Sequence, residues 1–591
     1  MLQTLDWIII VGFLSLIVGV SLSFARKAGK DLNSFFLGGR NLPWYIAGIS
    51  MVATTFAADT PLAVTELVAA NGISGNWLWW CFLAGGMLTT FFFANLWRKA
   101  GVLTEVELIE LRYTGWQAGL LRGFKGVYLG LFMNAVIIAW VNVALMALLE
   151  VFFGIEKSQA FQYTLVAMLI VAVYSSISGL LGVVFTDVIQ FIVAITGCII
   201  LAVLVVNSEE VGGIAGLKEK LPEDAFRFFP NIGAGSDGLK TLSLGFGSFF
   251  AYAAIQWWAS WYPGAEPGGG GYVAQRMMSA RSEKDAVYST LLFQVAHYCI
   301  RPWPWILVGL AALVLYPELD ATASKNGFVF AMRDFLPTGL KGLMLAAFLA
   351  AYMSTISTQL NWGASYLVND LYKRFIAPEA TDKHLVGVSR MMTLFLMLIG
   401  ARSTLLVENI ADAWGFIIQC GAGLGLVLIL RWYWWRINAW SEIAATLAPF
   451  ISMGVLFFIN LGRPEEAQIG FPDSFLITVL FTTIIWLMVT YLTRPTAMDH
   501  LKAFYERVRP DGAWGPVIQV AEGGADHLIK GNLQNLTICW LTSIVFTYSL
   551  LFFIGKIIFG EWMQSLGLFG LLLGCVLILR YFVPKTRIFQ T

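Results

Sequence analysis

Apolar residues fall in fifteen blocks along the chain, and short polar stretches separate them. A helix of about 20 apolar residues crosses the ~30 Å hydrocarbon core of a bilayer. The pattern therefore predicts an all-α integral membrane protein with about 15 transmembrane helices. The expected spans are 5–25, 41–69, 76–97, 123–153, 162–180, 183–207, 239–262, 285–316, 338–372, 385–401, 409–430, 438–461, 472–493, 535–558 and 563–583.

Two of these spans carry residues that a straight helix does not tolerate. The second span has Asp59 and Pro61 near its middle. The proline removes a helix hydrogen bond, and a carboxylate is costly in lipid. The seventh span runs into a stretch rich in Trp and Pro, residues 257–267, and then into four glycines, Gly268–Gly271. We expect these glycines either in a break within the core or in a flexible loop on the inner side.

The two breaks lie five spans apart, so the interrupted spans cross the membrane in opposite directions. This is typical of transporters built from an inverted repeat of five helices, in which the first helix of each half is unwound at a site near the midplane. The predicted organisation is an N-terminal extra helix with an inner loop (1–40), a first repeat (41–207), an outer loop (208–238), a second repeat (239–436) and C-terminal accessory helices (437–591) with an inner amphipathic loop (494–534).

Charge is scarce and unevenly placed. Only 13% of the residues are charged and 58% are hydrophobic, against ~25% charged in an average soluble chain, which excludes a soluble enzyme. With the N-terminus outside, 24 of the 38 lysines and arginines fall on inner segments and 9 on outer ones. The positive-inside rule therefore predicts a multi-pass protein of the plasma or inner membrane, with its N-terminus outside and its C-terminus cytoplasmic.

One polar segment has an apolar face. Residues 498–509 place four apolar side chains at helical spacing: Leu501, Phe504, Tyr505 and Val508. The spacing predicts an interfacial amphipathic helix on the inner face. The six cysteines and four histidines stand singly, without metal-ligand spacing, and no nucleotide or nucleophile motif appears. We therefore expect no catalytic residue and no enzymatic activity.

Hydroxyl groups concentrate in the span 338–372. Ser354, Ser357 and Thr358 share one helical face, and Thr355 lies beside them. Hydroxyl oxygens and unwound backbone carbonyls together form a neutral oxygen cage, which suits a hard cation such as sodium. Hydrogen bonding between helices is an equally good interpretation of the same residues.

Charged residues within spans are few. Asp187 lies in its span at a depth where a carboxylate should face a cavity, a cation or a partner. Arg301 lies between Cys299 and two prolines, and a buried guanidinium needs an anion or several acceptors. Its partner could be an acidic residue (Asp59, Asp187 or Glu266) or a bound substrate.

Six motifs, taken in their order and spacing, are similar to those of the sodium/solute symporter family, which includes bacterial galactose and proline symporters and animal sodium/glucose cotransporters. They are residues 36–44, 104–113, 178–190, 275–276, 351–355 and 435–439, and the resemblance covers roughly 26–445. The resemblance implies a LeuT-like fold, which is the five-plus-five inverted-repeat transporter core with two broken helices. It also implies sodium-driven uptake by alternating access.

The same resemblance implies sites, residue by residue. The sodium site of the family falls on the carbonyls of Ala53, Phe56 and Ala351 and the hydroxyls of Ser354 and Thr355. A second sodium, present in some members, would be held by Asp187, Ser357 and Thr358. Substrate-binding positions match Asp59, Thr60, Arg301 and Gln419, and Gln256, Trp257 and Trp258 align with gating residues. The family's sugar carriers have a lysine where Arg301 stands, and this chain departs from the pattern in its Pro-Gly-rich seventh span.

The sequence therefore predicts a sodium-coupled importer of a small polar solute, first a sugar or sugar derivative. One alternative is an importer of an organic acid or amino acid, because Arg301 could clamp a carboxylate. Another is a transporter-like membrane sensor, although no appended signalling domain is seen. The expected coupling ion is Na⁺, at least one. The expected partners are the solute, sodium and the lipid bilayer, with no nucleic acid and no obligate protein partner.

Overall fold

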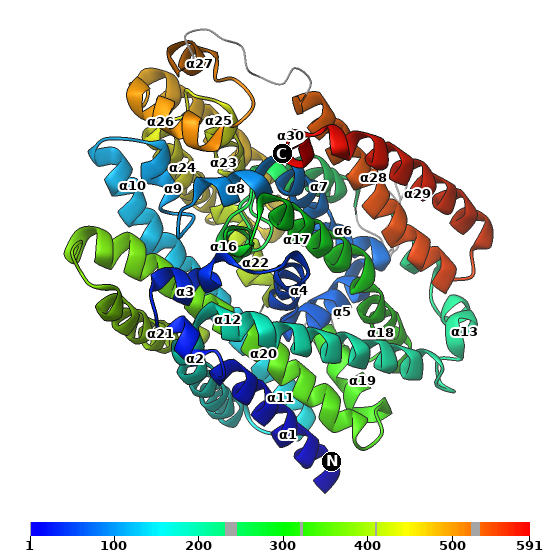
Figure 1. Cartoon of the computed structure of the whole chain (residues 1–591). Coiled ribbons are helices and arrows are strands. Elements are labelled where there is room, and N and C mark those ends of the chain that lie inside the picture. The colour runs from blue at the N-terminus through cyan, green and yellow to red at the C-terminus, as the bar shows by residue number, and fades with distance from the viewer. Residues whose placement is uncertain (1, 231–244, 320–322, 408–409, 522–531, 591) are drawn as a thin grey trace.

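The computed structural model describes residues 2–230, 245–319, 323–407, 410–521 and 532–590, and within them the chain is almost entirely helical (Figure 1). Among the described residues, eleven helices are long and apolar enough to cross a membrane, or thirteen when each of two bent pairs is one span. The expected count of about fifteen differs from thirteen at two places. Both are places where the chain is helical but not a straight, uninterrupted helix.

The first place is α12 (Lys157–Val206), which runs for 50 residues. Gly179 has φ 55° and ψ −161°, so the helix is interrupted between the expected spans 162–180 and 183–207. The second is the span expected at 239–262, where α14 (Phe246–Phe250), the helical residues 251–256 and α15 (Trp257–Ala259) are together too short for a straight span. Residues 239–244 of that span, and 231–238 of the expected outer loop, lie outside the described residues.

The second expected span is broken where Asp59 and Pro61 predict it. Here α4 (Trp44–Thr54) and α5 (Asp59–Asn71) meet at an angle of 58°. The two residues that predict the break also favour the start of the second helix. Pro61 lies in the first turn of α5, where no backbone N–H is needed, and the Asp59 carboxylate suits the positive end of the helix dipole.

The seventh expected span is broken as well. The chain unwinds after α15 and becomes helical again at α16 (Gly271–Ser279), and Gly268–Gly270 are buried between the two. The glycine run therefore lies in the break and not in an exposed loop. Gly268 and Gly269 each have a φ of +77°, a conformation that residues with a Cβ adopt at a cost.

A third break was not expected. α22 (Ile410–Cys420) and α23 (Gly425–Tyr433) meet at 43°. This break is hydrogen-bonded to the unwound segment after α15: Gly423 N–H donates to Ala259 O (2.8 Å), and Trp261 N–H donates to Gly421 O (3.3 Å). The Ser260 hydroxyl adds a bond to Ile418 O (2.9 Å). Two broken helices therefore share backbone hydrogen bonds across their breaks.

The broken helices lie at the centre of the bundle (Figure 1). α4 packs against α12, α16, α17 (Glu283–Val295) and α20 (Leu340–Ser365). Around this core stand the remaining helices of the central bundle: α6 (Trp77–Trp80), α7 (Phe82–Leu88), α8 (Ala94–Ala100), α10 (Trp116–Val127), α11 (Asn134–Phe153), α18 (Pro302–Leu315), α19 (Gly327–Phe335) and α21 (Asp382–Thr404).

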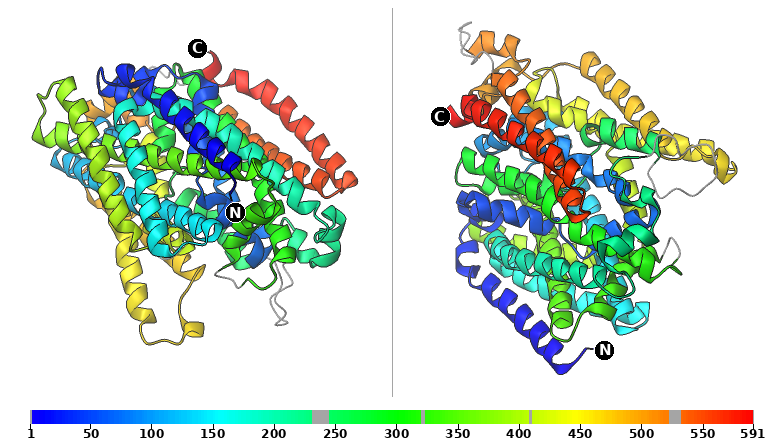
Figure 2. Two further views of the ribbon diagram at one scale, coloured as in Figure 1. Left: turned by 90° about the horizontal axis from the view of Figure 1, so that it is seen from below. Right: turned by 90° about the vertical axis from the view of Figure 1, so that its right-hand side faces the viewer.

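Five long helices lie at the periphery: α1 (Thr4–Leu22), α24 (Ala439–Asn460), α25 (Asp473–Leu492), α28 (Asn532–Ile558) and α29 (Trp562–Phe582). α24 and α25 form a hairpin that projects from the bundle, and α28 and α29 form a second hairpin along one side (Figure 2). Many apolar side chains of these helices are exposed, Phe458 and Met563 among them, as is normal where a helix faces lipid.

The amphipathic segment is helical but lies differently from what its pattern predicted. It forms α26 (Met498–Val508), and its four buried residues are the four apolar ones predicted. That face packs against protein, with the ring of Phe504 stacked on Trp514 (centroids 5.6 Å apart) and 6.1 Å from Trp432. The prediction of an apolar face was confirmed, but the prediction that this face lies in the membrane interface was wrong, because protein covers it. Helical spacing indicates an apolar face but not whether lipid or protein covers it. Residues 522–531, also expected on this side, lie outside the described residues.

Candidate ion and solute sites

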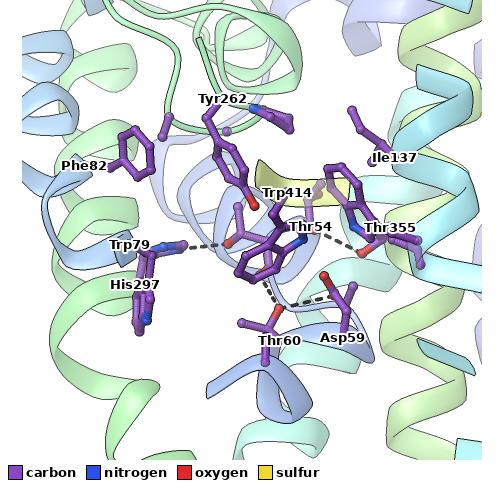
Figure 3. A pocket seen from close by; sticks show the side chains of 18 of the residues that line it. Thr54, Asp59, Thr60, Trp79, Phe82, Ile137, Tyr262, His297, Thr355 and Trp414 are labelled. Carbon is purple, nitrogen blue, oxygen red and sulfur yellow. Dashed lines mark hydrogen bonds between the residues drawn. The ribbon is translucent and has the colours of Figure 1, made fainter. Parts of the chain in front are cut away.

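A cavity opens beside the break between α4 and α5 (Figure 3). It contains about 900 Å³ of space free of protein atoms, part of it open to solvent. Water-sized molecules can occupy about 100 Å³ of it, which is smaller than the ~300–1,000 Å³ typical of small-molecule sites. Its polar lining comes from several elements, because Asp59 and Thr60 begin α5, Arg301 precedes α18 and Thr355 lies on α20.

Arg301 is 1% exposed and lines the cavity. Its guanidinium donates to the Thr55 hydroxyl (Nη1–Oγ1 2.9 Å) and to the carbonyl of Val52 (3.4 Å), and Nη2 lies 3.1 Å from His297 Nε2. Nε is buried without a hydrogen-bond partner among the described residues. No described carboxylate forms an ion pair with Arg301 within 4.0 Å, but of the acidic partners expected for it Asp59 is close enough to attract its charge.

Aromatic rings form much of the cavity wall. The ring of Tyr262 stacks on Phe82 (centroids 5.4 Å apart) and meets Trp414 at 6.1 Å. Trp79 stacks on Tyr298 at 5.7 Å. Flat rings of this kind bind the apolar faces of sugars and the hydrocarbon part of amino acids, while the polar groups of the same wall orient the ligand.

The expected sodium ligands lie on α20 and at the end of α4, two helices that pack against each other. The Thr355 hydroxyl donates to the carbonyl of Thr54 (3.0 Å) at the end of α4, and the Ser354 hydroxyl donates to Asp187 Oδ1 (2.5 Å). A hydroxyl that donates its proton in this way keeps its lone pairs for a cation. The Ala53 carbonyl already accepts the Phe56 amide (2.9 Å), in the turn that ends the helix.

Asp187 is fully buried at the centre of a polar network. One carboxylate oxygen accepts Ser354 and the other accepts Ser50 (2.5 Å). Arg276 of α16 lies beside it, with Nη2 3.8 Å from Oδ2, and the same nitrogen donates to Thr358 (2.9 Å). An arginine therefore lies against two of the three groups expected to hold a second sodium. The third group, the hydroxyl of Ser357, donates to the carbonyl of Ser354 within α20 (2.9 Å).

Three of the expected substrate residues do not line the cavity. Gln256 is fully buried and donates to the carbonyl of Leu78 (3.0 Å). The ring of Trp257 faces Trp540, 5.9 Å away. Gln419 donates to the Ser474 hydroxyl (3.2 Å) of α25. The cavity thus brings together Asp59, Thr60, Arg301 and Thr355, but not these three.

Other lining residues were not predicted to bind solute. They are Trp79, Phe82, Trp140, Tyr262, Tyr272, His297, Tyr298 and Gln359. One signal was available for His297, which lies four residues before Arg301 and therefore on the same face of a helix. The aromatic residues carry no such signal, because tryptophan and tyrosine are also common at membrane interfaces.

Comparisons with known proteins give one family. The model described as the sodium:solute symporter family matches residues 35–448. The sodium/glucose cotransporter of Vibrio parahaemolyticus is 25% identical over 513 residues, which are 82% of this chain and 90% of that protein. The sodium/proline symporter of Escherichia coli is 25% identical over 496 residues, 75% of this chain and 90% of that protein. The solved structure of a substrate-bound, outward-open Na⁺-coupled sialic acid symporter covers 84% of this chain and 99% of its own, at 20% identity and a TM-score of 0.65.

Proposed function

The chain belongs to the sodium:solute symporter family, and on that premise we propose that it imports a small polar solute by alternating access, with a sugar or sugar derivative as the first candidate. Its relatives are transporters and not enzymes, and Na⁺ is the coupling ion. We assign the sodium to the carbonyls of Ala53, Phe56 and Ala351 with the hydroxyls of Ser354 and Thr355. The solute occupies the cavity beside Asp59, Thr60 and Arg301.

One observation carries this proposal: Thr355 belongs both to the cavity wall and to the expected sodium cage. It bonds the end of α4 to α20 at the point where α4 is broken. A cation held there strengthens the contact between the two helices, and its loss weakens the same contact. Solute and sodium therefore stabilise one arrangement of shared parts, which is how two ligands become coupled.

The lining favours a sugar through Asp59 and Thr60. A carboxylate accepts hydrogen bonds from sugar hydroxyls, and the Trp and Tyr rings offer faces for stacking. A carboxylate-bearing solute is the second candidate, because Arg301 Nε has no hydrogen-bond partner and its guanidinium forms no direct ion pair among the described residues. A glucose carrier and a proline carrier are among the relatives.

The driving force fits an accumulating carrier. One sodium entering across ~100 mV supplies ~2.3 kcal/mol. A tenfold sodium gradient adds ~1.4 kcal/mol, so together they sustain roughly 500-fold accumulation of a neutral solute. A second sodium would square that limit. In the proposed orientation the N-terminus is outside, the C-terminus is cytoplasmic, and the chain spans the plasma or inner membrane.

Uptake into proteoliposomes tests the proposal. The purified full chain is reconstituted and offered labelled sugars, sugar acids and amino acids, with an inward gradient of either Na⁺ or K⁺. We expect one class of solute to accumulate with Na⁺ only. Accumulation that is equal with K⁺ would refute sodium coupling. Sodium-dependent binding of a solute without any uptake would favour the membrane sensor instead.

A further inference from the structure

A buried carboxylate lies in the unwound segment that follows α15. Glu266 is 3% exposed, and neither carboxylate oxygen accepts a hydrogen bond of ordinary geometry from the described residues. It belongs to the Pro- and Gly-rich stretch that departs from the family pattern. Pro263, Gly264 and Ala265 of this stretch line the solute cavity, but Glu266 does not. Buried ionised carboxylates are normally paired, because an unpaired one loses its hydration and gains nothing in return.

A second carboxylate, Glu105, reaches the same place from the loop after α8. Its Oε2 accepts the N–H of Gly271 (2.5 Å) and the hydroxyl of Tyr366 (3.0 Å). A Cβ placed on Gly271 would lie 2.5 Å from Glu266 Oε1, and one placed on Gly270 would lie 3.0 Å from Glu105 Oε2. Both carboxylates therefore crowd the same peptide, at glycines that leave room for them.

The groups around Glu266 supply no counter-charge. Glu105 acts on it as a like charge, and Tyr272 of α16 is another titratable neighbour. The ring of Trp362 of α20 approaches the same glycine, Gly271, that Glu266 approaches. Arg431 of α23 and Lys125 of α10 are basic groups beside Glu105, and neither forms an ion pair with Glu266 among the described residues. Arg431 Nη2 lies 4.0 Å from Glu105 Oε1, and its Nη1 donates to Glu442 (3.5 Å).

We propose that Glu266 is a proton-binding site and that its proton is bound from the outer side and released to the inner side in each transport cycle. Two carboxylates that crowd one peptide share a single negative charge more easily than they carry two. Glu105 accepts hydrogen bonds from Gly271 and Tyr366 and has an arginine 4.0 Å away. Only the backbone N–H groups of Gly264 and of its own residue approach Glu266, so the proton is placed on Glu266.

Release of this proton creates a negative charge in the unwound segment. The proton leaves to water and the charge stays on the Glu266 carboxylate. Arg431 is the group that can pair with this negative charge, because its Nε and Nη2 are buried without hydrogen-bond partners among the described residues. The unwound segment already packs on α23, where a Cβ on Gly268 would lie 3.2 Å from the carbonyl of Leu428. Protonation of Glu266 thus controls how the segment after α15 is held against α23.

Infrared spectroscopy tests the proton directly and needs no solute. The full chain is studied in lipid at pH 7 for its protonated-carboxyl band, which shifts in D₂O. We expect Glu266→Gln to lose part of this band, and the band to fade in the wild type as the pH is raised. Glu110→Gln is the matched control, because Glu110 is ion-paired to Arg122 and Arg374 and holds no proton. An unchanged band in Glu266→Gln would overturn the proposal. If that variant does not fold, Glu266→Asp decides, because a carboxyl that keeps its proton must move the band.

A second measurement tests exchange of the proton and rests on the proposed function. Proteoliposomes that contain a trapped pH dye are given the solute identified by the uptake panel, under a sodium gradient. We expect solute entry to acidify the lumen in the wild type, and the acidification to be lost in Glu266→Gln. Uptake with no lumen acidification in the wild type would overturn the exchange step. If no solute is taken up at all, the importer proposal fails and the infrared result still decides whether Glu266 carries a proton.

Discussion

Removal of one charge from the Asp187–Arg276 pair should be far more costly than removal of both. The two charges are 3.8 Å apart, and both side chains are fully buried. At an effective dielectric constant of ~20 their attraction is about 4 kcal/mol. Asp187→Asn, which keeps the acceptor for Ser50 and Ser354, should therefore lower the free energy of unfolding by about 4 kcal/mol, because it leaves a buried guanidinium without a counter-charge.

Arg276→Met should cost a similar amount for the opposite reason. The double variant should lose no more than about either single one, because it contains no uncompensated charge. The assay is unfolding of the purified protein by SDS titration in mixed micelles, followed by tryptophan fluorescence. A double variant that loses about 8 kcal/mol, the sum of the two single losses, would refute the reasoning, since additive losses mean that the two groups do not interact.

A second ion pair provides the control. Arg374 and Glu110 are closer, at 2.9 Å, but the arginine side chain is 46% exposed. Arg374→Met should cost less than about 1 kcal/mol, because solvent screens the attraction and replaces the lost contacts. If distance alone set the strength, this variant would be the more damaging of the two arginine substitutions.

Three further changes have definite outcomes. Ser354→Ala combined with Thr355→Ala removes two expected sodium ligands of ~1–1.5 kcal/mol each, and the sodium concentration for half-maximal uptake should rise by about 30- to 150-fold. Arg301→Lys replaces a planar guanidinium that reaches three acceptors with a single ammonium group. It should raise the KM for solute by about tenfold, measured from uptake at increasing solute concentration. Gly269→Ala places a Cβ 2.9–3.0 Å from Met277, Trp97 and Thr89 at a φ of +77°. It should cost about 1–3 kcal/mol in the SDS titration.

Each of these three predictions has a control variant or an outcome that would contradict it. Ser389→Ala with Thr393→Ala removes two buried hydroxyls that bond only to carbonyls of their own helix, and should leave sodium dependence unchanged. Unaltered sodium dependence in the variant at 354 and 355 would remove these residues from the sodium site. An unchanged KM for every transported solute would give Arg301 a structural role. Gly574→Ala has open space around its Cβ and should cost nothing, so an equal loss at both glycines would contradict the strain argument.

The helical architecture follows from local pattern to a large extent. Blocks of about 20 apolar residues need no partner to be recognised, since the bilayer imposes their length. The break before Asp59 was equally visible, because Pro61 has no N–H to continue the hydrogen bonding of the preceding helix. The break between α22 and α23 was missed, since its turn contains glycines, which helices also tolerate, and the hydrogen bonds that hold it come from residues 259–261.

The sites were less accessible from sequence, because they depend on which faces meet. Asp187 was identified as a carboxylate within a membrane span and Ser354 as part of a hydroxyl cluster. In the structure the Ser354 hydroxyl donates to Asp187. Gln419 follows a lining residue, Ile418, by one position, and that offset is enough to direct its side chain to α25. Arg276 belonged to a motif, but nothing in the motif shows that its guanidinium reaches Thr358 and Asp187 across three helices.

The hydrogen bonds between residues 259–261 and 418–423 have a consequence for how such a carrier can change its specificity. Three bonds join two stretches that are far apart in the sequence, and two of them use only backbone atoms. These two need glycine at 421 and 423, because a Cβ on Gly421 would lie 2.6 Å from the Trp261 nitrogen and Gly423 has a φ of +87°, but they do not depend on the other side chains. Side chains beside them, such as Tyr262 and Trp414, can therefore be replaced while the junction persists. Exchange of either stretch alone for one with a different turn would break the junction. The smallest unit that can be transplanted between relatives is therefore the two stretches together, and chimaeras should be built with both.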